Sequence, residues 1–186
     1  SGDPNMIAAF KSGHDIHAAT AAKVFHTSIE EVTREQRSAA KAVNFGIIYG
    51  QSAFGLAQNL QISRTEAKGI IDAYFEQYGT IKTYMDKVIA QAREEGYVET
   101  ILKRRRYLPD IHSANAVVRG FAERNAINAP IQGSAADIIK LAMVAVHKAM
   151  SKQKLQSKMI LQVHDELVFD VHRDEVELMQ QLVKKA

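Results

Sequence analysis

The segment from Thr33 to Gly50 constrains the fold more than any other part of the chain. Thr33 and Gln36 have the spacing of a capping box, in which two side chains close the start of an α-helix. Gly50 follows the last turn and is typical of a helix stop. Three apolar residues lie four positions apart and would face a core: Ala39, Val43 and Ile47. This segment is therefore predicted to be an amphipathic helix.

The other side of the same predicted helix carries two cations followed by two aromatic rings. Arg37, Lys41, Phe45 and Tyr49 are each four residues apart, so their row drifts by only about 40° per turn. Arginine offers a planar fork and lysine a point charge, which suits a polyphosphate. The rings suit the sugar and base of a nucleotide. The pattern also fits a surface helix with solvated cations and half-buried rings.

The rest of the chain is predicted to be mostly α-helical, with one small antiparallel β-hairpin (an α+β fold). Capping residues, glycines and prolines divide it into segments. Further helices are expected over residues 5–10, 16–26, 52–60, 63–78, 80–95, 114–127 and 134–150, with a short one after Thr27 or Ser28. Gly79 and Gly96 are expected to end helices, Pro130 and Gly133 to separate two, and Asp174 to cap the last. Strands are expected over residues 97–101, 159–163 and 167–171, the last two forming the hairpin.

The turn of that hairpin carries His164, Asp165 and Glu166. Adjacent carboxylates at a tight turn repel each other, and a divalent cation such as Mg²⁺ would relieve the repulsion. Aspartate is also common in turns for local reasons. The acidic pair is therefore either a metal-binding element or an ordinary turn.

A second series with a spacing of four consists of Arg124, Asn128 and Gln132. All three donate hydrogen bonds, and the minor groove of DNA presents acceptors at similar places in every base pair. Packing at the start of the following helix explains the series equally well, and Pro130 is expected to disturb its last turn. The basic run of residues 103–106 fits a phosphate-backbone contact or a solvated loop.

Composition excludes some classes of protein. The 186 residues contain no cysteine, which excludes disulfides and thiolate metal sites and agrees with a cytoplasmic location. No uninterrupted apolar run approaches ~20 residues, so no membrane partner is predicted. The net charge of +3 permits a polyanionic partner without requiring one.

Four stretches together resemble the family A DNA polymerases, of the bacterial DNA polymerase I type. The row from Arg37 to Gly50 resembles motif B, and residues 162–168 resemble motif C. Residues 123–137 resemble the block between these motifs, and residues 15–17 resemble the segment that leads into the fingers. The stretches follow the family's order and span nearly the whole chain.

The resemblance implies a DNA polymerase that binds primer–template DNA and dNTP and uses Mg²⁺. His17, Arg37 and Lys41 would hold the triphosphate, and Lys41 would also stabilise or protonate the leaving pyrophosphate. Phe45 would stack on the deoxyribose, and Tyr49 would lie by the templating position. The residues implied at the minor groove and primer end are Arg124, Asn128, Gln132 and His164. Asp165 would be a metal ligand, assisted by Glu166.

The resemblance also implies an incomplete catalytic centre. Residues 1–13 would be a lead-in from the palm, 14–120 the fingers, and 121–186 the C-terminal part of the palm. The family's other metal-binding aspartate, in a motif D-Y-S-Q-I-E-L-R, has no counterpart in this sequence. The upstream palm and thumb of a parent chain would then be partners, and this polypeptide by itself is expected to be inactive. Lys103 stands where relatives often place glycine at a hairpin tip.

Two other classes of function fit parts of the sequence. A non-catalytic helical nucleic-acid-binding module would bind DNA regardless of Mg²⁺ and dNTP. A metal-dependent hydrolase would need further His, Asp or Glu ligands at suitable spacing, and no convincing set is present.

Overall fold

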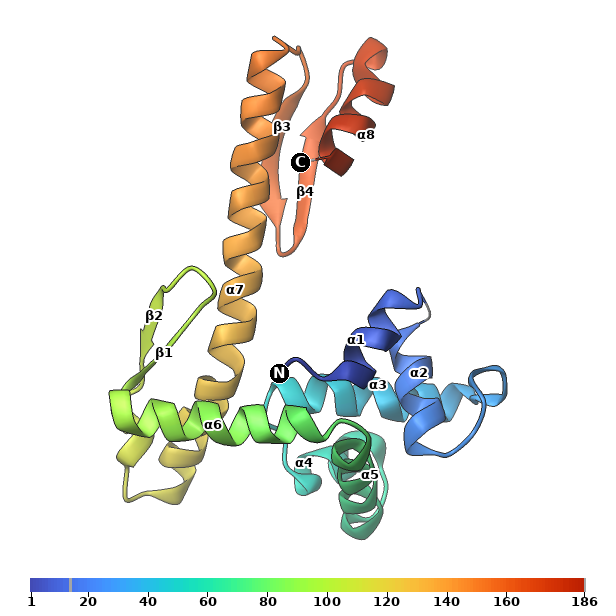
Figure 1. The fold of residues 1–186 in the computed structure, drawn as a ribbon, viewed down its shortest axis with the longest axis vertical. Coiled ribbons are helices and arrows are strands. Elements are labelled where there is room, and N and C mark those ends of the chain that lie inside the picture. Colours follow the sequence, from blue (N-terminus) through green and yellow to red (C-terminus); the bar gives the residue numbers. More distant parts are fainter. Residues whose placement is uncertain (14, 186) are drawn as a thin grey trace. The chain divides into compact units, whose positions relative to one another are not determined.

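The computed structural model describes residues 1–13 and 15–185, apart from the side chain of Ile48, and these residues are mostly helical (Figure 1). The α-helices are α1 (Pro4–Lys11), α2 (Ile16–Val24), α3 (Arg34–Ile48), α4 (Ala53–Leu60), α5 (Arg64–Gln77), α6 (Gly79–Glu95), α7 (Ala116–Lys152) and α8 (Val176–Lys185). Three short 3₁₀ helices are η1 (Ile29–Glu31), η2 (Pro109–His112) and η3 (Arg173–Glu175). The strands are β1 (Tyr97–Glu99), β2 (Arg105–Tyr107), β3 (Lys158–Val163) and β4 (Glu166–Asp170). The predicted fold class is confirmed.

The chain consists of two compact units. The first contains Ser1–Val98 and Arg105–Ala129, and the second contains Glu99–Arg104 and Pro130–Ala186. These two units do not test the boundaries of fingers and palm that were expected from the sequence, and those boundaries remain a prediction.

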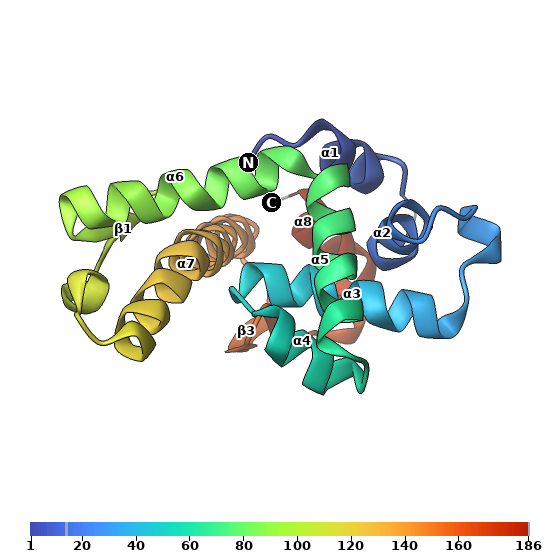
Figure 2. The same cartoon turned by 90° about the horizontal axis from the view of Figure 1, so that it is seen from below.

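The core of the first unit is built around α3. Helices α2, α3, α4 and α5 pack against one another and lie together in Figure 2. Val43 and Ile47 of α3 are buried there, as predicted, while Ala39 is half-buried. Leu56 and Tyr78 complete the centre of this cluster. The apolar side of α3 is thus fixed in the core, which leaves the row of cations and aromatic rings outside it.

Local sequence signals determine where most helices in this unit begin and end. Both predicted capping boxes form, one at Thr33 with Gln36 and one at Ser63 with Glu66. Gly50 has a φ of 64° directly after α3, a left-handed conformation that glycine adopts without steric cost. The side chain of Asp15 accepts a hydrogen bond from the Ala18 amide and so caps α2.

Two predicted helix boundaries were wrong. Gly79 does not end α5 but begins α6, because the buried Tyr78 takes the non-helical conformation (φ −125°, ψ 54°) that separates the two helices. Asp174 does not cap the last helix, because it lies inside η3 and α8 begins at Val176.

The predicted break at Pro130 and Gly133 was also wrong, because α7 continues through both residues. A proline inside a helix removes one backbone hydrogen bond and usually kinks or breaks it. Here side chains bind carbonyls around the proline: Ser134 Oγ donates to the Pro130 carbonyl at 2.5 Å, and Arg104 Nη2 donates to the Gly133 carbonyl at 3.1 Å. Burial also anchors α7 on either side of the proline, through Ala126 in one core and Val146 in another.

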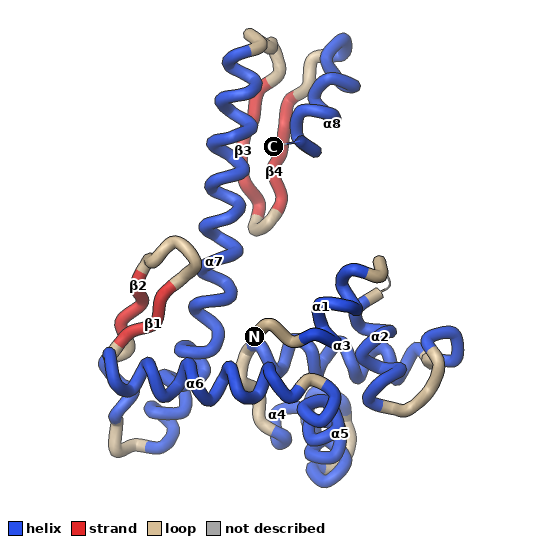
Figure 3. The backbone as a smooth tube through the Cα atoms, in the orientation of Figure 1, coloured by secondary structure: helices blue, strands red, loops and turns tan. Residues whose placement is uncertain are grey.

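Two separate antiparallel hairpins complete the fold (Figure 3). The predicted hairpin consists of β3 and β4, with Lys158 opposite Asp170 and Val163 opposite Glu166. The strand expected near residue 97 pairs with β2, a partner strand that the sequence analysis did not predict. Helix α8 covers the C-terminal hairpin, where Met179 and Leu182 pack with Phe169.

Among the residues that the structure describes, one helix, α7, is long and apolar enough to cross a membrane, by length and composition only. The sequence analysis did not anticipate this, because it looked for an uninterrupted apolar run. Only 17% of the apolar window of α7 is buried, although the helix supplies Ala122 and Ala126 to one core and Val146 and Met150 to another. It also carries Asp137, which forms an ion pair with Arg104.

Candidate functional site

The predicted row on α3 begins with a bidentate ion pair. Arg37 donates from Nε to Oδ1 of Asp15 at 3.2 Å and from Nη2 to Oδ2 at 2.8 Å. Asp15 is also the N-cap of α2, so the start of α2 and the first turn of α3 are held together. This side-on fork does not use Nη1 of Arg37. The guanidinium is therefore oriented by the carboxylate while its outer edge remains available to a second anion.

His17 lies next to this pair, as the second residue of α2. Its Nδ1 is 3.0 Å from the side-chain nitrogen of Asn44 on α3, and its ring centroid is 5.7 Å from that of Phe45. The structure thus brings His17, Arg37 and Phe45 together at the edge where α2 meets α3. Neither Asp15 nor Asn44 was predicted to contribute.

Charge and burial act on the titratable groups of this edge. The hydrogen bonds from Arg37, together with the one from the amide of Ala18, lower the pKa of Asp15 to about 2. Burial lowers the pKa of His17, and the positive charges of Arg37 and Lys41 act in the same direction against the opposing effect of Asp15. His17 is therefore neutral near pH 7, surrounded by two permanent cations.

A surface groove of about 350 Å³ continues along the same row. Its walls include Lys41, Phe45 and Tyr49 of the row together with Gln51 and Asn59. Phe45 is 46% exposed and Tyr49 is 51% exposed, so both rings are accessible. The groove thus combines a cation with two flat apolar faces, which suits a charged molecule with a flat ring.

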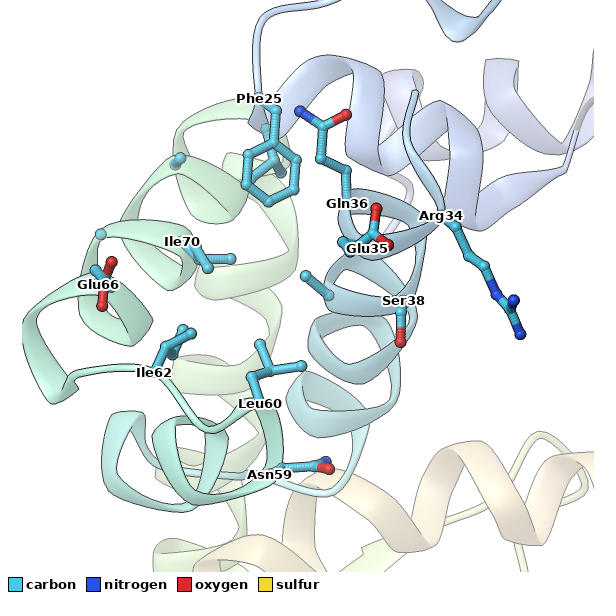
Figure 4. Close-up of a pocket in the computed structure, with 14 residues that line it drawn as sticks. Phe25, Arg34, Glu35, Gln36, Ser38, Asn59, Leu60, Ile62, Glu66 and Ile70 are labelled. Carbon is cyan, nitrogen blue, oxygen red and sulfur yellow. The ribbon is translucent and has the colours of Figure 1, made fainter. Parts of the chain in front are cut away.

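A larger groove of about 870 Å³ lies nearby between α3, α4 and α5 (Figure 4). Leu60, Ile62 and Ile70 point into it, and Glu35 and Glu66 lie at its rim. It contains neither Lys41 nor either ring of the row. Despite its greater size, its apolar walls and acidic rim make it a poorer candidate for binding a polyphosphate.

The second predicted series lies on α7, and the helix carries it through Pro130 without the predicted disturbance. Arg124 packs against Gly50 at the end of α3: a Cβ at Gly50 would lie 2.6 Å from its Cγ. Arg124 and Gln132 are exposed, and Asn128 is half-buried. Arg124 and Asn128 belong to the first unit and Gln132 to the second.

The acidic turn lies in the second unit, in the two-residue connection between β3 and β4. His164 has a φ of 53°, a left-handed conformation that is uncommon for residues other than glycine and recurs at functional sites. Gln162 Nε2 donates to its carbonyl at 2.6 Å. Asp165 and Glu166 are both exposed.

The acidic pair offers the right kind of ligand for Mg²⁺, since this ion prefers carboxylate oxygens. In residues 1–13 and 15–185, however, no group of three or more His, Cys, Asp or Glu side chains gathers where it could hold a metal ion. Asp165 and Glu166 are thus part of a metal site at most and do not complete one.

The basic run of residues 103–106 is partly used inside the second unit. Arg104 donates from Nε to the buried carboxylate of Asp137 at 2.5 Å. The exposed Lys103 forms an ion pair with the half-buried Glu99 at 3.3 Å and has a φ of 64°. The turn expected at the glycine position thus forms with lysine in a left-handed conformation.

Comparison with known proteins identifies the family. The model of DNA polymerase family A matches residues 1–186, the whole chain. The chain belongs to DNA polymerase family A. The resemblance of its four motifs to this family is thereby confirmed.

Individual family A members are similar along the whole chain. DNA polymerase I of Streptococcus pneumoniae serotype 4 is 56% identical over 186 residues, which are 100% of this chain and 21% of the relative. DNA polymerase I of Geobacillus stearothermophilus is 53% identical over 181 residues, 97% of this chain and 21% of the relative. The chain thus spans about a fifth of the length of these curated relatives.

A solved polymerase structure has the same fold. The POL domain of Pol1 from M. smegmatis, in complex with DNA primer-template and dNTP, matches with a TM-score of 0.94 and 49% sequence identity. The match covers 98% of this chain and 32% of that one.

Proposed function

We propose that this chain is part of a DNA-directed DNA polymerase that acts in DNA replication or repair. Its reaction would be template-directed transfer of a nucleotide from dNTP to a primer 3′-hydroxyl. The observation that carries the proposal is the cluster of His17, Arg37 and Phe45 where α2 meets α3, in a chain of DNA polymerase family A. The M. smegmatis relative, described with DNA primer-template and dNTP, supports these partners.

The first unit would bind the incoming dNTP. Arg37, Lys41 and His17 would hold the triphosphate, because a planar fork, a point charge and an imidazole N–H are three complementary phosphate donors. Phe45 would stack on the deoxyribose, and Tyr49 would lie beside the templating position. The groove that contains Lys41, Phe45 and Tyr49 supports this assignment.

In the reaction, the primer 3′-oxygen attacks the α-phosphorus while the bond from that phosphorus to the bridging oxygen of pyrophosphate breaks. The 3′-hydroxyl gives its proton to solvent water, and we assign to Lys41 the stabilisation or protonation of the leaving pyrophosphate. Protonation restores the charge balance on the departing group, and the ammonium of a lysine has a proton to give.

Four residues would contact the primer–template. Arg124, Asn128 and Gln132 can donate to minor-groove acceptors that are similar in all base pairs, which would test pairing without reading sequence. His164 would lie near the primer end. Support comes from the i, i+4 spacing that α7 maintains from Arg124 to Gln132.

Asp165, assisted by Glu166, would contribute ligands to a divalent-cation site, with Mg²⁺ as the proposed ion. The cation would neutralise charge on the phosphates. Because the described residues offer no third ligand, we propose that parts of a longer protein, including upstream palm and thumb, complete the site. We also propose a cytoplasmic location and no membrane partner.

The proposal is tested by primer extension with the longer protein that contains this chain. Lys41→Ala and Asp165→Ala should each reduce extension by on the order of 10² or more, since each removes a group proposed to act in the transition state. Lys68→Ala and Asp174→Ala are matched controls, because both residues are exposed charges outside the proposed site. Extension should require Mg²⁺.

Two results would contradict the proposal. DNA binding that ignores both Mg²⁺ and dNTP, without any extension, would support a non-catalytic nucleic-acid-binding module instead. Template-dependent synthesis by the purified 186-residue chain would refute the proposal that its metal site is incomplete.

A further inference from the structure

We propose that Asn44 is a positioning residue that fixes the hydrogen-bonding state of His17. Its side-chain amide donates to Nδ1 of His17, which leaves the imidazole proton on Nε2 and directs that N–H outward as a donor for phosphate. This inference rests on the proposed role of His17 as a triphosphate ligand.

Asn44 is an unusual residue for its position on α3. It is 9% exposed and lies on the buried side of the helix beside Val43, which is 1% exposed. A buried amide without partners is unfavourable, so such a residue is expected to have specific partners. Here those partners are on α2, and one of them is His17.

The hydrogen bonds around Asn44 fit an arrangement in which both hydrogens of its amide nitrogen are used. The hydroxyl of Thr20 lies 2.8 Å from the Ile16 carbonyl and 3.3 Å from Oδ1 of Asn44. Donation along the shorter contact leaves its oxygen to accept. Asn44 Nδ2 donates to that oxygen at 3.1 Å, and the hydroxyl of Tyr78, 3.4 Å away, can donate to it as well. The second hydrogen of Asn44 Nδ2 then points to His17 Nδ1 at 3.0 Å.

This arrangement decides the tautomer of His17. A nitrogen that accepts a hydrogen bond carries no proton, so Nδ1 is bare and the proton of the neutral ring is on Nε2. Thr20 and Tyr78 are each 0% exposed, so the side of the arrangement that faces them is buried. The ring of Phe45 lies beside the imidazole, with the two centroids 5.7 Å apart.

The charged surroundings act in the same direction. Burial and the positive charges of Arg37 and Lys41 on α3 lower the pKa of His17. Asp15 at the start of α2 raises this pKa, but its effect is smaller than the sum of the others. From the end of α5, Tyr78 faces this network in its neutral form, because burial raises its pKa. A neutral His17 that donates from Nε2 can therefore bind a phosphate with little dependence on pH above its lowered pKa.

Asn44→Asp is the most informative variant because it reverses the hydrogen bond at nearly constant shape. A carboxylate accepts where the amide donated, so Nδ1 takes the proton and Nε2 becomes a bare acceptor in the neutral ring. Below its now raised pKa, His17 would be an imidazolium and would still donate to phosphate. Above that pKa the donor would be lost.

The first measurement reads the tautomer directly. In ¹⁵N-histidine NMR spectra of the 186-residue chain near pH 8, with His17 assigned by comparison with His17→Gln, we expect a protonated Nε2 and a bare Nδ1. Because this measurement needs no Asn44 variant, it stands even if Asn44→Asp fails to fold. A protonated Nδ1 in the wild-type chain would overturn the inference.

The second measurement is the pH dependence of KM for dNTP in primer extension by the longer protein. The KM of the wild type should change by less than about twofold between pH 7 and 9. The KM of Asn44→Asp should rise on the order of tenfold from pH 7 to pH 9, which is the effect of losing one hydrogen bond to a charged group. In a His17→Ala background, Asn44→Asp should add no pH dependence. A merely structural Asn44 would alter stability and leave the pH profile unchanged, and that result would also overturn the inference.

Failure of the inference is distinguishable from failure of the proposed function. If His17→Ala leaves KM for dNTP unchanged, the role of His17 as a triphosphate ligand is wrong whatever its tautomer. If His17→Ala raises KM but the spectra show a protonated Nδ1, the proposed function survives and the role of Asn44 does not.

Discussion

Arg37 and Asp15 form a bidentate ion pair across the junction of α3 and α2, with hydrogen bonds of 3.2 and 2.8 Å. The carboxylate occupies the side of the guanidinium and leaves Nη1 unused by this pair. Asp15 therefore orients the arginine that we propose contacts the triphosphate, although it lies 22 residues earlier in the chain. Both side chains are close to half exposed, so the pair contributes orientation more than stability.

Replacing Asp15 should weaken dNTP binding without disrupting the helix start. Asparagine caps helices as well as aspartate does, so Asp15→Asn keeps the bond to the Ala18 amide and removes the charge that orients Arg37. We expect KM for dNTP to rise by roughly threefold to tenfold, the size of about one hydrogen bond. Asp15→Ala should show the same rise and also a lower melting temperature, because it removes the cap. Unchanged KM in both variants would contradict the positioning role.

The pair of Arg37 and Asp15 also predicts how the free energy of unfolding depends on pH. The pKa of Asp15 is lowered from 3.8 to about 2, so the folded state holds its ionised form more tightly than the unfolded state does. Its contribution is fully present above pH 3.8 and is lost as pH falls toward 2. In urea unfolding between pH 5 and 2, wild type should lose more free energy of unfolding than Asp15→Asn. The other carboxylates titrate in both proteins, so only the difference between the two proteins reports on Asp15. If the free energy of unfolding fell in parallel with pH in both proteins, the prediction would be refuted.

Gly50→Ala should destabilise the chain more than Gly96→Ala. Both glycines have left-handed φ values, 64° and 75°, and an alanine there costs about 1 kcal/mol. A Cβ at Gly96 meets open space, whereas one at Gly50 would lie 2.6 Å from Cγ of Arg124. The free energy of unfolding should therefore fall further for Gly50→Ala, by roughly 1 kcal/mol. In the longer protein, DNA affinity should fall for Gly50→Ala and remain unchanged for Gly96→Ala. If the two variants had equal effects on the free energy of unfolding and on DNA affinity, the contact between Gly50 and Arg124 would not have the proposed role.

Lys103→Gly should stabilise the chain. Lysine at this position has a φ of 64°, which costs about 1 kcal/mol relative to glycine. Both Lys103→Gly and Lys103→Ala remove the ion pair with Glu99, which is worth little because the lysine is exposed. The two variants then differ by the backbone conformation, and thermal unfolding should show glycine as the more stable by roughly 0.5–1 kcal/mol. Alanine equal to or more stable than glycine would mean that the turn is unstrained.

Local signals were sufficient to predict most helices, whereas contacts between distant segments could not be predicted. The boxes at Thr33 and Ser63 form because their partners are three residues away. The partners of Pro130 were invisible for the opposite reason: the side chain that binds the Gly133 carbonyl comes from Arg104, 29 residues earlier. The proline rule failed where burial on either side of Pro130 anchors α7 in two cores.

The candidate site divides in the same way. The row on α3 follows from a spacing of four, so its accessible side was predictable. The residues that orient it were missed: Asp15 was recognised as a cap and not as the partner of Arg37, and Asn44 was not singled out. A polar residue beside Val43 on the buried face was a signal for Asn44, but its partner His17 lies 27 residues away.

The most direct test of the central claim is dNTP binding with the two cations of the row removed. Affinity for dNTP is measured by calorimetry or fluorescence on the longer protein with primer–template bound, for wild type, Arg37→Ala/Lys41→Ala, and the control Lys68→Ala/Lys82→Ala. The control removes the same charge from exposed ion pairs on α5 and α6. We expect Kd to rise by on the order of 10² or more in the first variant, as two charge-assisted contacts are lost, and to remain within about twofold in the control. Equal affinities in all three proteins would show that the row on α3 does not bind the triphosphate.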